Sequence, residues 1–433
     1  MTALPQAFVA QMAEVLEEEL TAFLASYEEP YYRGLRRNPF KQPTSGLGAW
    51  VQGLEAPIPW EENGCYLALE SLAGSHPLHE GGSYYLQEPS AMIPAAVLNP
   101  KPGERVLDLC AAPGGKSTQL AVRLQGQGLL VANEPVPSRA QILSRNLERM
   151  GVPNSLVVSA MPDALARKWA DFFDAIMVDA PCSGEGMFRR HPETRAEWTP
   201  QSPEGCAKRQ WEILCQAAKM LRPGGQLCYA TCTLNRIEND EMIQRFLEEH
   251  PEFELQPIRL NGLPENEGML HIYPHQVKGE GHFAALLHKK GDAVRLPASC
   301  TGLKPVTKEA AQVMQTFHKG LNASGMLGDT LFQLAEWPDV KGIKVLRAGL
   351  HLGQQKGKVF APDHALATVW GENNFPVCPV EEETARRYLK GETFDCDKRG
   401  WHVIKLDGVS LGWGKASDGI MKNHYPKGLR NGK

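Results

Sequence analysis

A short apolar strand, a glycine turn and a helix follow one another in the first third of the chain, and no other feature constrains the fold as strongly. Residues 106–109 are typical of a buried strand, and residues 117–124 are typical of a helix. Between them, Pro113, Gly114 and Gly115 predict a tight turn, because glycine accepts a positive φ and lets another backbone approach closely. The free amide groups of the helix face this turn. The arrangement predicts a nucleotide or cofactor site in an open α/β sheet.

Two further apolar runs each lead into a loop that contains a cysteine. Residues 175–179 are followed by Ala-Pro-Cys182. Residues 225–231 are followed by Cys232 and a threonine. Because the ligand crevice of an open parallel sheet lies outside the carboxyl ends of its strands, we expect both cysteines at one rim. Two thiols at that rim can act as a nucleophile and a helper.

The glycine turn does not match the common phosphate-binding motifs. A P-loop follows G-x-x-x-x-G-K-S, and Cys110 occupies its first glycine position. The dinucleotide fingerprint G-x-G-x-x-G is absent as well. Glu134 ends the next apolar run, where a carboxylate can accept hydrogen bonds from ribose hydroxyls. The glycines alone would fit an ordinary structural turn, but with Glu134 and the two cysteine loops they favour adenosine without a triphosphate, as in S-adenosylmethionine.

Cysteine at such a site suits methyl transfer to a ring carbon. C5 of a pyrimidine is not nucleophilic until a thiolate adds to C6 and makes C5 enamine-like. The C5 proton must then leave, and the thiol must be expelled. A free cysteine titrates at about pH 8.5, so the nucleophile needs a helix N-terminus, a cation or a polar partner. Lys116, at the start of the helix after the glycine turn, is a candidate for that cation.

Several motifs together resemble the RNA (cytosine-5) methyltransferases of the Sun/Fmu family, and within it the RsmF-like branch that acts on ribosomal RNA. The motifs are Glu-Pro-Ser-Ala-Met (88–92), Leu-Asp-Leu-Cys-Ala-Ala-Pro-Gly-Gly-Lys-Ser (107–117), Asp-Ala-Pro-Cys-Ser-Gly-Glu-Gly-Met-Phe-Arg (179–189) and Ala-Thr-Cys-Thr-Leu-Asn (230–235). Gly-His-Phe-Ala-Ala-Leu-Leu (281–287) resembles the family's last catalytic strand. The resemblance is strong over residues 85–290 and looser in the flanks.

The resemblance implies a role for each position. It implies Cys232 as the nucleophile and Cys182 as the thiol that assists release of the methylated base. In DNA cytosine-5 methyltransferases the Pro-Cys cysteine attacks instead, so two such thiols favour RNA as the substrate. The expected catalytic residues are Cys232, Cys182, Asp179 and Lys116. The expected cofactor-binding residues are Cys110, Ala111, Ala112, Pro113, Gly114, Gly115, Lys116, Glu134, Asp163 and Asp179.

Two aspartates have a second interpretation. Asp163 would accept a hydrogen bond from the adenine amino group, but it could equally be the N-cap of the helix that follows it. Asp108 either contacts the cofactor or caps the end of its strand.

With 433 residues the chain is too long for one hydrophobic core. We expect an N-terminal α+β RNA-recognition domain at 1–84 and a Rossmann-like S-adenosylmethionine-dependent methyltransferase domain at 85–290. A central auxiliary domain at 291–370 and a PUA-like RNA-binding β domain at 371–433 would follow. The expected fold class is α/β, because strands and helices alternate in the catalytic segment as a parallel sheet requires.

The net charge of −4 conceals basic segments. Residues 31–41 carry four cations and three aromatics without an acid, and residues 415–433 carry five cations against one aspartate. Arg189, Arg190 and Arg195 follow the Pro-Cys loop and would lie at the mouth of the site. Each segment alone fits a solvated face, but together they favour contact with RNA, because cations bind phosphates and aromatics stack on bases.

Other features limit the class of protein. Without a secretory signal, we expect the ten cysteines to stay reduced, and because they include no C-x-x-C pair, we expect no metal site. No run reaches the roughly 20 apolar residues of a membrane span, and residues 1–20 contain no Lys or Arg, so we expect neither a membrane segment nor a signal peptide. We therefore expect a cytoplasmic, monomeric enzyme that methylates C5 of cytosine in ribosomal RNA, in particular 16S RNA. The same chemistry on transfer RNA and a non-catalytic RNA-binding assembly factor remain alternatives.

Overall fold

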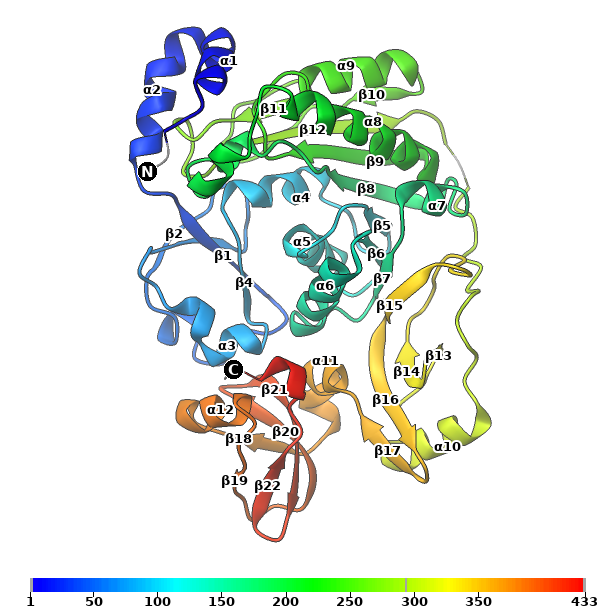
Figure 1. Cartoon of the computed structure of the whole chain (residues 1–433). Helices are drawn as coiled ribbons and strands as arrows, with labels where there is room; N and C mark the ends of the chain where they lie inside the picture. Colours follow the sequence, from blue (N-terminus) through cyan, green and yellow to red (C-terminus); the bar gives the residue numbers. More distant parts are fainter. Residues whose placement is uncertain (1–2, 293, 431–433) are drawn as a thin grey trace.

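The structure, a computed structural model, describes residues 3–292 and 294–430 (Figure 1). Its central sheet has the strand order β10-β12-β9-β8-β5-β6-β7-β15, and β11 pairs with β12. The strands of this sheet are β5 (Arg105–Asp108), β6 (Leu129–Asn133), β7 (Ser155–Ser159), β8 (Phe173–Asp179), β9 (Leu221–Thr231), β10 (Phe253–Leu255), β11 (Met269–Ile272), β12 (His282–Lys289) and β15 (Lys344–Ala348).

The order of the parallel strands creates the ligand crevice. Strand β5 pairs in parallel with both β6 and β8, and the chain continues outward to β7 on one side and β9 on the other. Open α/β sheets bind ligands where the strand order reverses in this way, outside the carboxyl ends. The expected α/β, Rossmann-like core is confirmed.

Helices cover both faces of the central sheet. On one face, α5 and α6 contribute Leu120 and Leu143 to a buried cluster, and on the other α8 and α9 contribute Leu214 and Phe246. The helices of the core are α4 (Ile93–Leu98), α5 (Gly115–Leu124), α6 (Pro137–Arg149), α7 (Pro162–Ala166), α8 (Ser202–Met220) and α9 (Asp240–Glu249). Burial on both faces explains why the parallel strands are almost continuously apolar.

The segment after residue 290 does not stay apart from the core. Strand β15, which lies in the expected auxiliary region, pairs antiparallel with β7 and forms one edge of the catalytic sheet. The rest of that region forms α10 (Lys308–Phe317) and a sheet of β13 (Gly325–Leu327), β14 (Thr330–Gln333), β16 (Leu350–Lys356) and β17 (Val359–Pro362). Helix α11 (His364–Asn374) then leads to the last sheet, and the expected boundary at 370/371 falls within it.

The first and last sheets share a hydrophobic core. Leu35 and Tyr84 of the N-terminal sheet lie in one buried cluster with Ile404 and Leu406 of the C-terminal sheet, and Figure 1 shows α3 beside β21 and α12. The N-terminal elements are α1 (Gln6–Leu16), α2 (Leu20–Ala25), β1 (Arg33–Arg37), β2 (Leu54–Pro57), β3 (Gly64–Leu67), α3 (Pro77–Glu80) and β4 (Tyr84–Leu86). The C-terminal elements are β18 (Val377–Pro379), α12 (Glu382–Leu389), β19 (Phe394–Asp395), β20 (Gly400–Leu406), β21 (Val409–Ser417) and β22 (Ile420–Asn423).

Candidate active site

A cavity of about 750 Å³ opens at the carboxyl ends of the parallel strands. Small-molecule sites commonly enclose about 300–1,000 Å³, so the volume suits a cofactor and part of a substrate. The expected site residues that line it are Cys110, Ala112, Glu134, Asp163, Asp179, Cys182 and Cys232. The other expected residues, Ala111, Pro113, Gly114, Gly115 and Lys116, form the turn and the start of α5 beside it. The strand ends therefore bring together the residues that the motifs singled out.

The two loop cysteines lie side by side. Their Sγ atoms are 3.3 Å apart. The hydrogen bond with Cys232, followed by burial and nearby negative charge, raises the pKa of Cys182 well above its usual range. Cys182 therefore keeps its proton at neutral pH and can donate it toward Cys232. The geometry suits a division of roles in which one thiol attacks and the other holds a proton.

Lys116 supplies a cation next to these thiols. Its Nζ donates a hydrogen bond to Asp179 Oδ2 over 2.7 Å. Burial alone would lower the pKa of Lys116, but the Asp179 carboxylate and its hydrogen bond outweigh burial and raise it, with Cys232 acting in the same direction. Lys116 therefore stays protonated within electrostatic range of Cys232, as expected for a cation that stabilises a thiolate.

Two buried carboxylates, which sequence reasoning missed as site residues, join the cysteine loops to each other. Glu238, which follows the Thr-Cys loop, accepts hydrogen bonds from Ser183 N over 3.0 Å and from Asn235 Nδ2 over 2.8 Å. Glu185, which follows the Pro-Cys loop, accepts from Thr233 Oγ1 over 2.9 Å. Each carboxylate thus binds the opposite loop, and together the two carboxylates fix the position of one cysteine loop relative to the other. Their spacing in the sequence carries no signal of this, because the partners meet only in the fold.

We expect Glu238→Gln to reduce methylation at least tenfold with little change in cofactor affinity. The side-chain amide of the glutamine would place an N–H group against Ser183 N or Asn235 Nδ2, which now donate to the carboxylate. Each hydrogen bond to a charged group contributes roughly 1.5–3 kcal/mol. Steady-state methylation and cofactor titration measure the two effects. Glu241→Gln, on the exposed face of α9, is the matched control. Unchanged methylation by the Glu238 variant would contradict a role in loop positioning.

The cofactor half of the cavity centres on Glu134. This residue is 2% exposed, accepts a hydrogen bond from Val136 N over 3.0 Å and pairs with Arg139 at 3.2 Å. Val136 and Met161 add exposed apolar walls, and Asp163 lines the same cavity. The cavity thus combines a carboxylate suited to ribose hydroxyls, apolar side chains suited to a base and a second carboxylate, that of Asp179. Such a lining fits a nucleoside that carries a cationic group. The residues therefore fit S-adenosylmethionine.

The structure excludes one interpretation of each of two aspartates. Helix α7 begins at Pro162 and its N-cap is Met161, so the N-cap interpretation of Asp163 is wrong. Asp163 instead lies in the first turn, lines the cavity and pairs with Arg167 at 2.6 Å. Asp108 is fully buried and accepts a hydrogen bond from Ser117 Oγ over 2.6 Å, and burial raises its pKa to about 7. Asp108 therefore supports the start of α5 rather than lining the cavity.

Two of the three arginines expected at the mouth of the site are buried instead. Arg189 pairs with Glu280 at 3.0 Å, and the two side chains are 3% and 0% exposed. Arg195 is also buried and donates to Phe188 O over 2.9 Å. The expectation of RNA contact is wrong for both, because each guanidinium binds groups inside the fold. Arg190 remains partly exposed and lies over the ring of Tyr31.

Two cations of the basic segment 31–41 also bind groups inside the fold rather than facing solvent. Arg36 is 1% exposed and donates to Thr118 Oγ1 over 2.6 Å, and burial lowers its pKa to about 10. Lys41 donates to Arg149 O over 2.9 Å. These two cations hold the N-terminal sheet against the core, so the expectation of phosphate contact is wrong for them. Arg37 is exposed.

The C-terminal basic segment keeps its cations at the surface where it is described. Lys415, Lys422 and Lys427 are exposed, and Lys415 lies over the ring of Trp401 at 5.3 Å. Residues 431–433 of this segment lie outside the described residues.

Within residues 3–292 and 294–430, no group of three or more His, Cys, Asp or Glu side chains could hold a metal ion. No helix in the same residues is long and apolar enough to cross a membrane.

Comparisons with known proteins agree with these features. Four family models match the chain: "16S rRNA methyltransferase RsmB/F" over residues 95–288, "N-terminal domain of 16S rRNA methyltransferase RsmF" over 4–89, "RsmF rRNA methyltransferase first C-terminal domain" over 317–369 and "Methyltransferase RsmF PUA domain" over 375–431.

Curated relatives match along the whole chain. It is 32% identical over 464 residues to "Ribosomal RNA small subunit methyltransferase F" of Klebsiella pneumoniae (strain 342), which covers 99% of this chain and 97% of the relative. It is 33% identical over 469 residues, with the same coverage, to the protein of that name from Escherichia coli O157:H7 (strain EC4115 / EHEC).

Solved structures match the catalytic part of the fold. A methyltransferase homologue from Pyrococcus horikoshii is 28% identical with a TM-score of 0.58, over 66% of this chain and 96% of that one. NSun6 from the same organism, solved with SFG, shares the fold with a TM-score of 0.59 at 22% identity, over 67% of this chain and 100% of that one. With relatives above 30% identity over nearly its full length, the chain belongs to the RsmF family of 16S ribosomal RNA methyltransferases.

Proposed function

We propose that this protein methylates C5 of a cytosine in small-subunit ribosomal RNA with S-adenosylmethionine as the methyl donor. The observation that carries the proposal is the pair of thiols 3.3 Å apart at the ends of adjacent strands β8 and β9. Methylation of an amine or a hydroxyl has no use for such a pair, whereas methylation of a pyrimidine carbon requires a nucleophile that later leaves.

The cofactor would be held by the turn at 110–116, by Glu134 and by Asp163. Glu134 would accept hydrogen bonds from the ribose hydroxyls, and Val136 and Met161 would flank the adenine. When bound, S-adenosylmethionine supplies a methyl group on a positively charged sulfur. Asp179, at the end of β8, lines the same cavity and would offer a carboxylate to that charge.

Cys232 would act as the nucleophile. Its thiolate adds to C6 of the cytosine, which forms an S–C6 bond and moves the π electrons of the C5–C6 bond to C5. Lys116 stabilises the thiolate before attack, since it stays protonated and lies within electrostatic range. After C5 is methylated, solvent water in the open cavity would take the C5 proton, the electron pair of the C5–H bond would restore the C5–C6 double bond, and the S–C6 bond would break to release the Cys232 thiolate.

Cys182 would assist that release. Its raised pKa means that its proton is available next to Cys232, and its loop is joined to the Thr-Cys loop through Glu185 and Glu238. The target base must leave its stack to reach this rim, at a cost of a few kcal/mol. The proposal includes a monomer, and a ribosomal RNA substrate would place the protein in the cytoplasm.

Two other functions fit less well. Transfer RNA as the substrate would use the same chemistry, but the curated relatives are named for small-subunit ribosomal RNA. A non-catalytic assembly factor would have no need for Cys182 against Cys232, or for Lys116 paired with Asp179, at the carboxyl ends of the strands. Transfer of labelled methyl groups to purified 30S ribosomal RNA and to transfer RNA tests all three. The proposal expects label in 5-methylcytosine of the ribosomal RNA, and label only in transfer RNA or in neither would contradict it.

We expect Glu134→Ala to weaken S-adenosylmethionine binding roughly ten- to a hundredfold, because ribose hydroxyls left without an acceptor cost about 1–3 kcal/mol. Calorimetric titration measures the affinity, and an RNA-binding assay should show little change. Glu104→Ala, on the exposed loop before β5, serves as a control that keeps the cavity intact. A folded Glu134 variant with unaltered cofactor affinity would remove this residue from the proposed site.

A further inference from the structure

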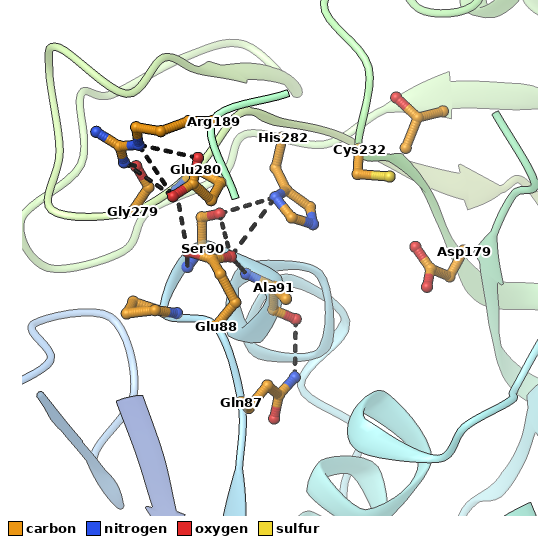
Figure 2. Close-up of polar contacts among 12 residues, drawn as sticks. Gln87, Glu88, Ser90, Ala91, Asp179, Arg189, Cys232, Gly279, Glu280 and His282 are labelled. Atoms are coloured by element: carbon orange, nitrogen blue, oxygen red, sulfur yellow. Dashed lines mark hydrogen bonds and ion pairs between the residues drawn. The ribbon is translucent and has the colours of Figure 1, made fainter. Parts of the chain in front are cut away.

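His282 lies next to the proposed nucleophile although no motif assigned it a role. It is the first residue of β12, which runs antiparallel to β9. Phe283 pairs with Thr231 at the end of the ladder, so His282 begins β12 beside the point at which the chain leaves β9 for Cys232. Figure 2 shows the ring of His282 between Ser90 on one side and Cys232 and Asp179 on the other.

The hydrogen bonds around His282 settle which ring nitrogen carries the proton. The Glu88 carboxylate accepts from Ser90 N, Ala91 N and Glu280 N, and from the Ser90 hydroxyl over 2.6 Å. Because the single hydroxyl proton of Ser90 goes to Glu88, Ser90 Oγ must accept from His282 Nδ1, 2.8 Å away. His282 therefore carries its proton on Nδ1, and its Nε2 is an unprotonated acceptor.

That acceptor has no partner within the fold. No described residue forms a hydrogen bond with His282 Nε2. This nitrogen is not fully enclosed by protein atoms, so it reaches accessible space although the side chain is only 3% exposed. Figure 2 shows this nitrogen turned away from Ser90. Burial, and after it the charge of Lys116, lowers the pKa of His282 well below its usual range. The ring stays neutral, and Nε2 stays an acceptor.

We infer that His282 Nε2 accepts a hydrogen bond from the 4-amino group of the target cytosine and thereby distinguishes cytosine from uracil. The inference rests on the proposed function, because it requires a pyrimidine at Cys232. Cytosine presents an N–H donor at C4, whereas uracil presents an oxygen that would face the lone pair of Nε2. A site that is built to bind an N–H group rejects the analogue that lacks it, because its own buried acceptor is then left unpaired.

A second use of Nε2, as the base that removes the C5 proton, fits the surroundings less well. A nitrogen with a strongly lowered pKa next to the Lys116 cation is a poor proton acceptor, whereas a hydrogen-bond acceptor needs only to remain unprotonated. The two roles also act at different steps. Recognition of the amino group affects formation of the covalent adduct, whereas proton removal affects its resolution.

The test compares adduct formation on two bases. In a Cys182→Ala background, the rate of adduct formation is measured with RNA that carries either cytosine or 2-pyrimidinone, which lacks the 4-amino group, at the mapped target. We expect His282→Asn, whose shorter side chain can still donate to Ser90, to slow the reaction with cytosine roughly tenfold and to leave the reaction with 2-pyrimidinone unchanged. His282→Gln, whose amide oxygen can reach the position of Nε2, should recover part of the loss. His288→Asn, on the same strand, is the control.

Each contrary result has a distinct meaning. Equal losses on cytosine and on 2-pyrimidinone would overturn the inference in favour of a structural role. Accumulation of adduct by His282→Asn with Cys182 intact would overturn it in favour of proton removal. Absence of any adduct in Cys182→Ala with His282 intact would overturn the proposed adduct mechanism, and with it this inference.

Discussion

Cys232→Ala is expected to abolish methylation and to form no covalent complex with RNA, whereas Cys182→Ala is expected to trap a protein–RNA complex that survives a denaturing gel. The first variant lacks the atom that adds to C6. The second can still attack, but it lacks the neighbouring proton that Cys182 holds 3.3 Å from Cys232. Turnover should therefore fall to background in both variants, with the adduct present in only one.

Other mechanisms predict other patterns on the same gel. If the Pro-Cys thiol attacks, as in DNA cytosine-5 methyltransferases, the adduct should appear with Cys232→Ala and be absent with Cys182→Ala. A mechanism without a thiol nucleophile predicts no adduct in either variant and substantial methylation in both. Cys206→Ala, in a half-buried part of α8, is the control for loss of a cysteine as such. Only the pattern with the adduct in Cys182→Ala agrees with the roles proposed here.

Arg189→Met is expected to lower the free energy of unfolding by about 3–5 kcal/mol, the cost of leaving one partner of a buried ion pair uncompensated. Glu280 would lose its counter-charge, and Ser26 O and Gly279 O would lose their donors. The effect should appear as a lower midpoint in denaturant-induced unfolding.

Arg190→Met provides the comparison for Arg189. The Arg190 side chain lies over Tyr31 at 5.3 Å and is partly exposed, so its loss should cost about 1 kcal/mol or less. Equal stability of the two variants would contradict the structural role of Arg189. A weakened salt dependence of RNA binding in a stable Arg189→Met protein would instead favour the phosphate contact expected from the sequence.

The main elements of the site could be predicted from the sequence because each depends on a local pattern. A strand end followed by Pro-Cys or Thr-Cys needs no knowledge of distant residues, and the parallel sheet then requires Cys182 and Cys232 to meet at one rim. Glu134 is predictable for the same reason, since it ends the strand after the glycine turn. The roles assigned to these residues remain proposals, but the structure places them around one cavity.

The features that could not be predicted from the sequence share a physical cause. A cluster of cations indicates positive charge but not the partner that neutralises it, and Arg189 meets Glu280 only because β12 returns beside β9. Glu185 and Glu238 each bind a loop that follows a different strand. His282 gains its role from Ser90, nearly two hundred residues earlier in the chain. The place of β15 in the catalytic sheet is likewise a tertiary contact, and the four-domain division remains a prediction.

Bisulfite sequencing of ribosomal and transfer RNA from cells that lack the gene, complemented with either the wild-type or the Cys232→Ala protein, tests the central claim most directly. The account predicts that at least one cytosine of small-subunit ribosomal RNA loses its resistance to bisulfite in the deletion strain. Wild-type protein should restore the resistance, and Cys232→Ala should not. Unchanged resistance in small-subunit RNA, a loss confined to transfer RNA, or restoration by Cys232→Ala would contradict it.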